Sequence, residues 1–120
     1  MAQHNILGKQ GEELAVEFLV KKGYKILHAN WRINHLEVDI ICEKNNLLVF
    51  VEVKTRNTDY FGNPEEFVDK KKEKNIINAA ESYIVERNLD HEVRFDIISV
   101  IFLKSEIKIH HIEEAFFSEL

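Results

Sequence analysis

Three charged residues lie close together in the first half of the chain, where two apolar segments follow one another. Asp39 lies in the segment Leu36–Glu43, and Glu52 and Lys54 lie in the segment Leu47–Thr55. Two carboxylates held near each other must share a proton or a cation, because like charges at close range are unfavourable. With a lysine beside them, they supply the groups that hold Mg²⁺ and orient a water molecule at a phosphate. The chemistry to consider is therefore metal-assisted hydrolysis.

A hairpin between the two segments would bring these three residues together. Positions 45–46 are both asparagine, which tolerates the positive φ that a two-residue hairpin turn requires. In the register set by this turn, Asp39 lies opposite Glu52, and Glu37 lies opposite Lys54. The turn therefore predicts a cluster of charged groups at the end of the hairpin that lies far from the turn.

The two faces of this hairpin differ in character. One face is wholly apolar and must lie against a core. Its predicted cross-strand pairs are Val38 with Val53, Ile40 with Val51, and Cys42 with Val49. On the charged face, Ile41 and Phe50 near the turn are apolar, and we expect the first helix to cover them. Ordinary ion pairs at a wet sheet edge are the alternative reading of the charges. The apolar character of Leu48–Lys54 argues against an edge strand and favours a half-buried site.

The remaining sequence predicts one α/β domain over residues 1–120. Apolar spacing predicts a helix from Glu12 to Lys22, ended by Gly23, and a second helix from about Asn63 to Arg87. Further strands are expected over residues 24–30, 93–103 and 107–112, followed by a helical or loose tail over 113–120. The order α-β-β-β-α-β-β predicts a central mixed sheet flanked by helices.

Composition limits the class of protein. The 120 residues suit one compact domain, and a net charge of −5 counts against a protein that simply grips nucleic-acid phosphates. The single cysteine, Cys42, cannot form an internal disulfide, which fits a reducing compartment. The first residues lack the pattern of a signal peptide, and no apolar run approaches the roughly 20 residues that span a bilayer. We expect a cytoplasmic protein without a membrane partner.

Two sequence motifs carry a family resemblance. Glu37-Val-Asp39-Ile-Ile followed by Val49-Phe-Val-Glu52-Val-Lys54 resembles the signature of the PD-(D/E)xK nuclease superfamily. Within it, the chain is similar to the YraN family, small bacterial proteins related in fold to archaeal Holliday-junction resolvases. Nearly the whole chain takes part, from Gly8-x-x-Gly11-Glu12-x-x-Ala15 to Arg94-Phe95-Asp96-Ile97. The resemblance implies a restriction-endonuclease-like fold and hydrolysis of phosphodiester bonds in branched or structured DNA, and it leaves a homodimer open.

The resemblance also implies roles for individual residues. Asp39, Glu52 and the backbone carbonyl of Val53 would hold Mg²⁺ or Mn²⁺, and Glu12 on the first helix would complete the metal site. Lys54 would position or activate the attacking water and stabilise charge on the phosphate. From the residues alone, an acid in a first helical turn is explained equally well by the helix dipole, so the role of Glu12 rests on the family.

Nucleic-acid contacts are implied at three further positions. These are Arg56 just beyond the catalytic strand, Lys72 on the second helix, and Tyr60, which would stack on a base. Leu36 and Glu73 depart from the family pattern and motivate an alternative, a non-catalytic nucleic-acid-binding module that keeps the nuclease fold. A third hypothesis is a protein-interaction domain whose carboxylates are structural.

Overall fold

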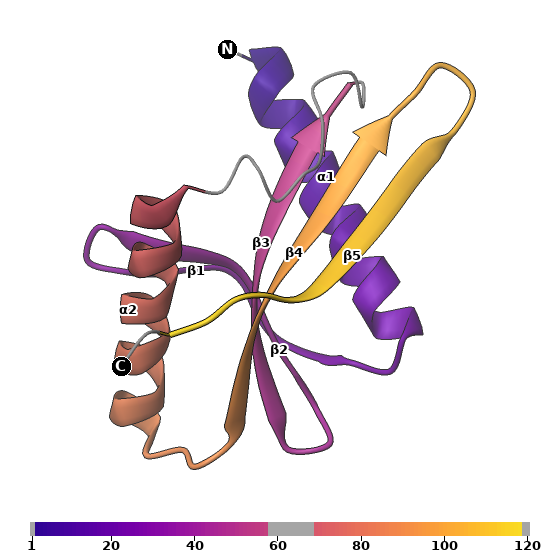
Figure 1. Cartoon of the computed structure of the whole chain (residues 1–120). Coiled ribbons are helices and arrows are strands. Elements are labelled where there is room, and N and C mark those ends of the chain that lie inside the picture. The colour runs from indigo at the N-terminus through magenta and orange to yellow at the C-terminus, as the bar shows by residue number, and fades with distance from the viewer. Residues whose placement is uncertain (1, 58–68, 119–120) are drawn as a thin grey trace.

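The computed structural model of the chain describes residues 2–57 and 69–118, with side chains described from residue 6. Over these residues a five-stranded sheet lies between two helices (Figure 1). The elements are α1 (Ala2–Lys21), β1 (Lys25–Ile33), β2 (Leu36–Lys44), β3 (Leu47–Arg56), α2 (Lys70–Arg87), β4 (Glu92–Phe102) and β5 (Ile107–Phe116). The strands lie side by side in chain order; β3 and β4 run parallel, and the other neighbours run antiparallel. The predicted α/β class, mixed sheet and element order are confirmed.

The hairpin of β2 and β3 forms as its turn predicts. Asn45 and Asn46 have φ of 50° and 66°, the left-handed values of the expected turn. Ile41 lies opposite Phe50, and Ile40 lies opposite Val51, in the predicted register. Local turn chemistry and the alternation of apolar residues thus fix this part of the sheet.

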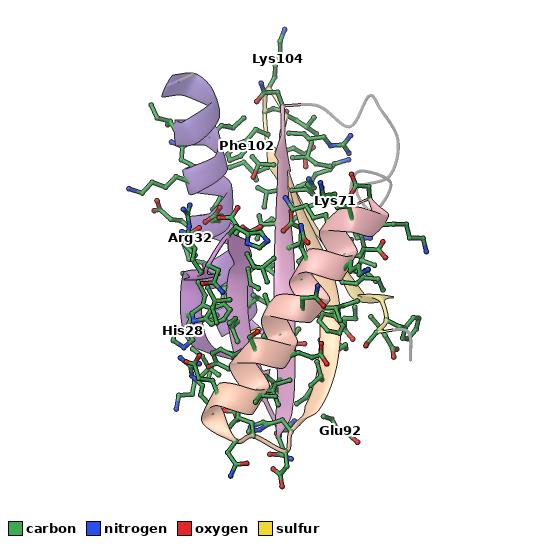
Figure 2. The ribbon with its side chains drawn as sticks, turned by 90° about the vertical axis from the view of Figure 1, so that its left-hand side faces the viewer. His28, Arg32, Lys71, Glu92, Phe102 and Lys104 are labelled. Carbon is green, nitrogen blue, oxygen red and sulfur yellow. The ribbon has the colours of Figure 1, made fainter. Side chains whose placement is uncertain are left out.

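The two faces of the sheet pack against different helices, and two expectations about them are wrong. Val38, expected on the same face as Ile40, packs with the core on the α2 side, because β2 leaves its pairing with β3 beyond Ile40. Ile41 and Phe50 pack with Ile76 and Tyr83 of α2, not with the first helix. The opposite face packs under α1; its core members are Ala15, Leu19, Tyr24, Ile40, Cys42, Val49, Val51, Ile98 and Val100. The reason is topological: a parallel β3–α2–β4 crossover of the usual hand puts α2 on one face, which leaves the other for α1. Figure 2 shows the sheet nearly edge-on between the two helices.

The first helix is longer than predicted. It begins at Ala2 instead of Glu12, so Gly8 and Gly11 lie inside it. Its end is as predicted, because Gly23 has φ 95° and its N–H donates to the carbonyl of Val20. Within the described part of the chain, neither helix is long and apolar enough to cross a membrane.

The second helix begins later than predicted. Asp69 is extended, and its side chain accepts a hydrogen bond of 2.8 Å from the Lys72 N–H as the N-cap of α2. The predicted start near Asn63 lies outside the described residues, but a helix continuous through Asp69 is excluded. The far end agrees with the sequence: Arg87 is the last helical residue, and Asn88 caps it in the left-handed conformation.

The last strand continues into the segment predicted as a helical or loose tail. β5 runs to Phe116, whose ring stacks on Phe95 of β4 with centroids 5.3 Å apart. The backbone N–H of Glu114 donates to the buried Asp96 carboxylate, which holds the strand against β4 through a bulge. Tertiary contacts therefore override a segment whose local sequence has no clear strand pattern.

The two glycines inside α1 have opposite roles, which a pair of alanine variants would reveal. A Cβ on Gly11 would lie 2.0 Å from Thr55 Oγ1 and 3.0 Å from Thr55 Cβ, whereas nothing lies within 4 Å of one on Gly8. We expect Gly11→Ala to lower the free energy of unfolding by about 1–3 kcal/mol through overpacking. Gly8→Ala should raise it by about 0.5–1 kcal/mol through helix propensity. Urea unfolding measures both; equal effects would contradict the close approach of α1 to β3.

Candidate functional site

The candidate site lies where β2 and β3 separate. Their ladder runs from Lys44–Leu47 to Ile40–Val51. Beyond it, β2 continues to pair with β1, and β3 continues to pair with β4 as far as Arg56. Figure 1 shows the β1–β2 hairpin turning away from the far end of β3. The site therefore occupies a fork in the sheet.

Asp39 stands at the branch point of this fork. The direct backbone pairing of Asp39 with Glu52 expected from the hairpin register is absent from the β2–β3 ladder. Instead, Asp39 Oδ2 accepts a hydrogen bond of 2.8 Å from the Val53 N–H. The carboxylate thus replaces the next rung of the ladder and ties the two strands together where they diverge. Val53 itself packs on the α1 side of the sheet.

Glu37 does not pair with Lys54 as the register predicted. Glu37 is exposed, and its Oε2 lies 3.3 Å from Arg32 Nη2 on the neighbouring strand β1. Both side chains are largely in solvent, so the pair contributes little to stability. The fork is the physical reason, because it carries Glu37 away from β3 together with β1.

The carboxyl groups of Asp39 and Glu52 nevertheless meet. Glu52 is 3% exposed, and its side chain is within hydrogen-bonding reach of Asp39. Burial, together with the negative charge of Glu52, raises the pKa of Asp39 to about 8, although the Val53 N–H opposes the shift. Glu12 adds a smaller charge effect in the same direction. Without a cation, the Asp39 carboxyl therefore keeps its proton in most molecules at neutral pH.

Two lysines converge on the same carboxylate. Glu52 Oε2 lies 2.8 Å from Lys72 Nζ and 3.8 Å from Lys54 Nζ. Burial works against the charged form of Lys72, but the hydrogen bond and the charge of Glu52 outweigh it and raise its pKa. The Asp69 cap fixes the first turn of α2 and so brings Lys72 over the sheet. The sequence pattern alone predicted that Lys54 lies beside the carboxylates, whereas the prediction for Lys72 was based on the family resemblance.

Glu12 approaches the site from α1. It is half-buried, and burial together with the charges of Glu37 and Glu52 raises its pKa against the effect of a hydrogen bond with Asn30. Asn30 has φ 54°, and its neighbours in β1 pair with the residues on either side of Asp39. Sequence reasoning missed Asn30; its only signal was an asparagine, a residue that adopts positive φ more readily than most, at the end of the predicted strand 24–30.

The two remaining residues predicted to contact nucleic acid are Arg56 and Tyr60. Arg56 is the last residue of β3 and lies on the same side of the strand as Lys54 by alternation. Tyr60 lies outside the described residues. The structure therefore brings Asp39, Glu52 and Lys54 together at one point.

The comparisons with known proteins agree on one family. The model described as "Uncharacterised protein family UPF0102" matches residues 11–100. The chain belongs to the UPF0102 family. A UPF0102 protein of Flavobacterium psychrophilum is 51% identical over 117 residues, with 98% of each chain covered. One of Christiangramia forsetii is 53% identical over 117 residues, also 98% of each, and one of Bacteroides thetaiotaomicron is 50% identical over 120 residues, 100% of this chain and 99% of that one. The resemblance to this family of bacterial proteins, also called YraN, is confirmed.

Ser99 is a further residue beside the candidate site that sequence reasoning missed. It is fully buried in β4, directly beside Lys54 of β3. Its Oγ has no hydrogen-bond partner among the described residues. A buried hydroxyl without a partner costs stability, and such groups occur where a ligand or a reacting group supplies the partner. No sequence signal distinguishes this serine from a packing residue.

The donor atoms of the candidate site fit a hard cation only if the backbone takes part. Among the described residues, no three His, Cys, Asp or Glu side chains cluster as a ready metal site. Asp39 and Glu52 supply two carboxylates in contact, and the Val53 carbonyl follows next on β3. Oxygen ligands of this kind suit Mg²⁺, which is held by one or two carboxylates and keeps several waters. The donor set therefore fits magnesium better than zinc.

Proposed function

We propose that this protein is a Mg²⁺- or Mn²⁺-dependent endonuclease of the PD-(D/E)xK superfamily that hydrolyses phosphodiester bonds in branched or structured DNA. One observation carries the proposal. The half-buried Asp39 and the buried Glu52 form a carboxyl pair in a fork of the sheet, and the ammonium groups of Lys54 and Lys72 lie 3.8 and 2.8 Å from Glu52 Oε2. A pair with an aspartate pKa near 8 is costly for folding alone, and a shared cation would remove that cost.

Each residue of the site has a chemical role in this proposal. Asp39, Glu52 and the Val53 carbonyl would hold the metal, which when bound supplies positive charge to the phosphate and lowers the pKa of a water. Lys54 holds the attacking water and the phosphate oxygens through its ammonium group. Glu12 is held at the edge of the site by its hydrogen bond with Asn30, where its carboxylate would orient the attacking water.

A cleavage assay tests this function. Single-stranded, duplex, flap and four-way-junction DNA are incubated with the protein in Mg²⁺, Mn²⁺ or EDTA. We expect metal-dependent cleavage of the branched substrates, and a loss of at least about 100-fold in Glu52→Gln, because a metal ligand becomes a neutral amide. Glu37→Gln, an exposed acid outside the carboxyl pair, is the matched control and should keep nearly full activity. Cleavage that survives unchanged in Glu52→Gln would point to a contaminant and refute the mechanism.

One observation favours a second candidate, a DNA-binding module without turnover. The Lys72 ammonium lies 2.8 Å from Glu52 and already supplies the positive charge that a metal would bring. In this case calorimetry would detect no Mg²⁺ binding to the wild type, while Lys72→Met would gain Mg²⁺ binding. Salt-sensitive DNA binding without cleavage in any metal would then describe the protein.

A further inference from the structure

We infer that the cavity between α2 and the end of β5 docks a segment of a partner protein in which apolar side chains are flanked by lysine or arginine. The cavity has a volume of about 270 Å³ and lies on the side of the sheet that faces α2. Three parts of the chain line it: α2, the start of β4, and the end of β5 with the two residues that follow. Figure 1 shows the end of β5 reaching across to α2.

The inner surface of this cavity is apolar. Ala80, Phe95 and Phe116 are its buried lining residues, and the two phenylalanine rings stack with centroids 5.3 Å apart. Ile77 and Ile84 of α2 are half-buried and line it from the helix. The core under α2 therefore continues into the cavity without a polar layer between them.

Two large apolar side chains are exposed at the rim of the cavity. Phe117 is 64% exposed, and Val93 is 38% exposed. Apolar side chains exposed around a pocket are typical of protein-interaction sites. A volume of about 270 Å³ is below the range of roughly 300–1,000 Å³ that is typical of small-molecule pockets. The cavity therefore suits one or two anchoring side chains of a protein better than a drug-sized molecule.

Charge complementarity indicates that the partner is basic. Glu81 of α2 and Glu114 of β5 are exposed at the cavity, and neither carboxylate makes an ion pair with another described residue. Arg94 also lines the cavity, but its guanidinium lies 2.8 Å from the Asp96 carboxylate, which compensates its charge. The last lysine of α2, Lys74, precedes Glu81 by about two helical turns. Two uncompensated carboxylates thus flank an apolar cavity, which matches apolar side chains between lysines or arginines.

The cavity is separate from the candidate site. Glu81 lies about 14 Å along α2 from Lys72, at a rise of about 1.5 Å per residue. The residues that line the cavity include neither carboxylate of the pair and neither lysine beside it. The inference therefore stands or falls independently of the proposed function.

Fluorescence anisotropy with two labelled synthetic peptides tests this docking site. One peptide carries phenylalanine and leucine between lysines, and the other carries the same apolar pair between glutamates. We expect the lysine peptide to bind at least about tenfold more tightly at low salt. Phe117→Ser should weaken its binding about tenfold, because the rim loses its most exposed apolar side chain. Glu81→Lys combined with Glu114→Lys should make the glutamate peptide the tighter binder.

The matched control variants lie on α1, on the opposite face of the sheet. Val20→Ser removes an apolar side chain that is 54% exposed. Glu13→Lys combined with Glu17→Lys, two exposed acids, makes the same change in net charge as the double variant of the cavity. Each control should alter binding of the lysine peptide less than about twofold. Thermal unfolding of each variant shows that it still folds.

The outcomes distinguish a basic partner from other occupants. Equal binding of the two peptides, or equal losses in Phe117→Ser and Val20→Ser, would overturn the inference. Sedimentation analysis tests a second copy of the chain as the occupant. A wild-type dimer that Phe117→Ser dissociates would assign the cavity to self-association and would also overturn it. A monomeric wild type that prefers the lysine peptide, with selective loss in Phe117→Ser, would support it whether or not the protein cleaves DNA.

Discussion

Asp39→Asn is expected to stabilise the metal-free protein, by about 2–4 kcal/mol at pH 8 and by almost nothing at pH 4. The ionised form of Asp39 is unfavourable in the fork, because burial and the charge of Glu52 raise its pKa from 3.8 to about 8. An acid with a raised pKa contributes its full stability below the unfolded pKa. That stability is lost as the pH rises through the folded value. Between pH 4 and pH 8 the wild type should therefore lose about 1.4 kcal/mol per pH unit from this group at most.

Asparagine removes the titration and keeps the contacts. Its side-chain carbonyl can accept the Val53 N–H, and its amide can donate to Glu52. Urea unfolding at pH 4 and pH 8 measures the difference. Glu37→Gln removes an exposed carboxylate of the same strand and should change stability by less than about 0.5 kcal/mol at either pH. If Asp39→Asn lowered stability equally at both pH values, the carboxyl pair would not be strained.

Mg²⁺ should reverse the order of stability of the wild type and Asp39→Asn. If Asp39 is a metal ligand, Mg²⁺ stabilises the wild type by mass action, and more strongly at pH 8 than at pH 6, where protons compete for the carboxylate. Asp39→Asn should gain little from the same Mg²⁺ concentration. A wild type whose unfolding ignores Mg²⁺ would favour the module without turnover, or a structural role for the carboxylates.

The meeting of Asp39, Glu52 and Lys54 could be predicted because it depends on local rules. The asparagine turn fixes the register, and alternation along β3 places Glu52 and Lys54 on one side. The fork could not be predicted in the same way. A hairpin register extended from its turn assumes that both strands stay paired, whereas β2 follows β1 and β3 follows β4 beyond Val51. The pairing of β2 with β1 and of β3 with β4 depends on tertiary structure, and no local sequence pattern predicts where it overrides the hairpin.

Residues that come from distant elements were the hardest to find. Asn30 and Ser99 belong to different strands, and each is an ordinary strand residue when viewed alone. Their importance follows from their neighbours in the fold: Asn30 contacts Glu12 of α1, and Ser99 lies beside Lys54 of β3. The face of the sheet that α1 covers could have been predicted. Once β3 and β4 are parallel neighbours, the usual hand of the crossover places α2 on one face and leaves the other face for α1.

Asp96, which is fully buried, should behave in the opposite way to the half-buried Asp39. Its Oδ2 accepts hydrogen bonds from Arg94 Nη2 at 2.8 Å and from His111 Nε2 at 2.7 Å. Its Oδ1 accepts from Arg94 Nε at 2.8 Å and from the Glu114 N–H at 3.0 Å. Burial alone would raise the pKa of Asp96, but these donors lower it below its usual range. The fold thus holds one aspartate whose pKa is raised and one whose pKa is lowered.

Asp96→Ala is expected to cost about 3–5 kcal/mol of unfolding free energy at pH 7, because it leaves the largely buried Arg94 guanidinium without its carboxylate. An acid with a lowered pKa contributes its stability above the unfolded pKa of about 3.8, and that stability is lost as the pH falls through the folded value. The stability lost in Asp96→Ala should therefore shrink in acid, whereas the stability gained in Asp39→Asn grows as the pH rises. Asp90→Ala, an exposed aspartate, is the matched control and should change stability by less than about 0.5 kcal/mol. Urea unfolding from pH 3 to pH 8 gives the result; a penalty below 1 kcal/mol at pH 7 would show that the bonds of Asp96 do not hold β5 to the sheet.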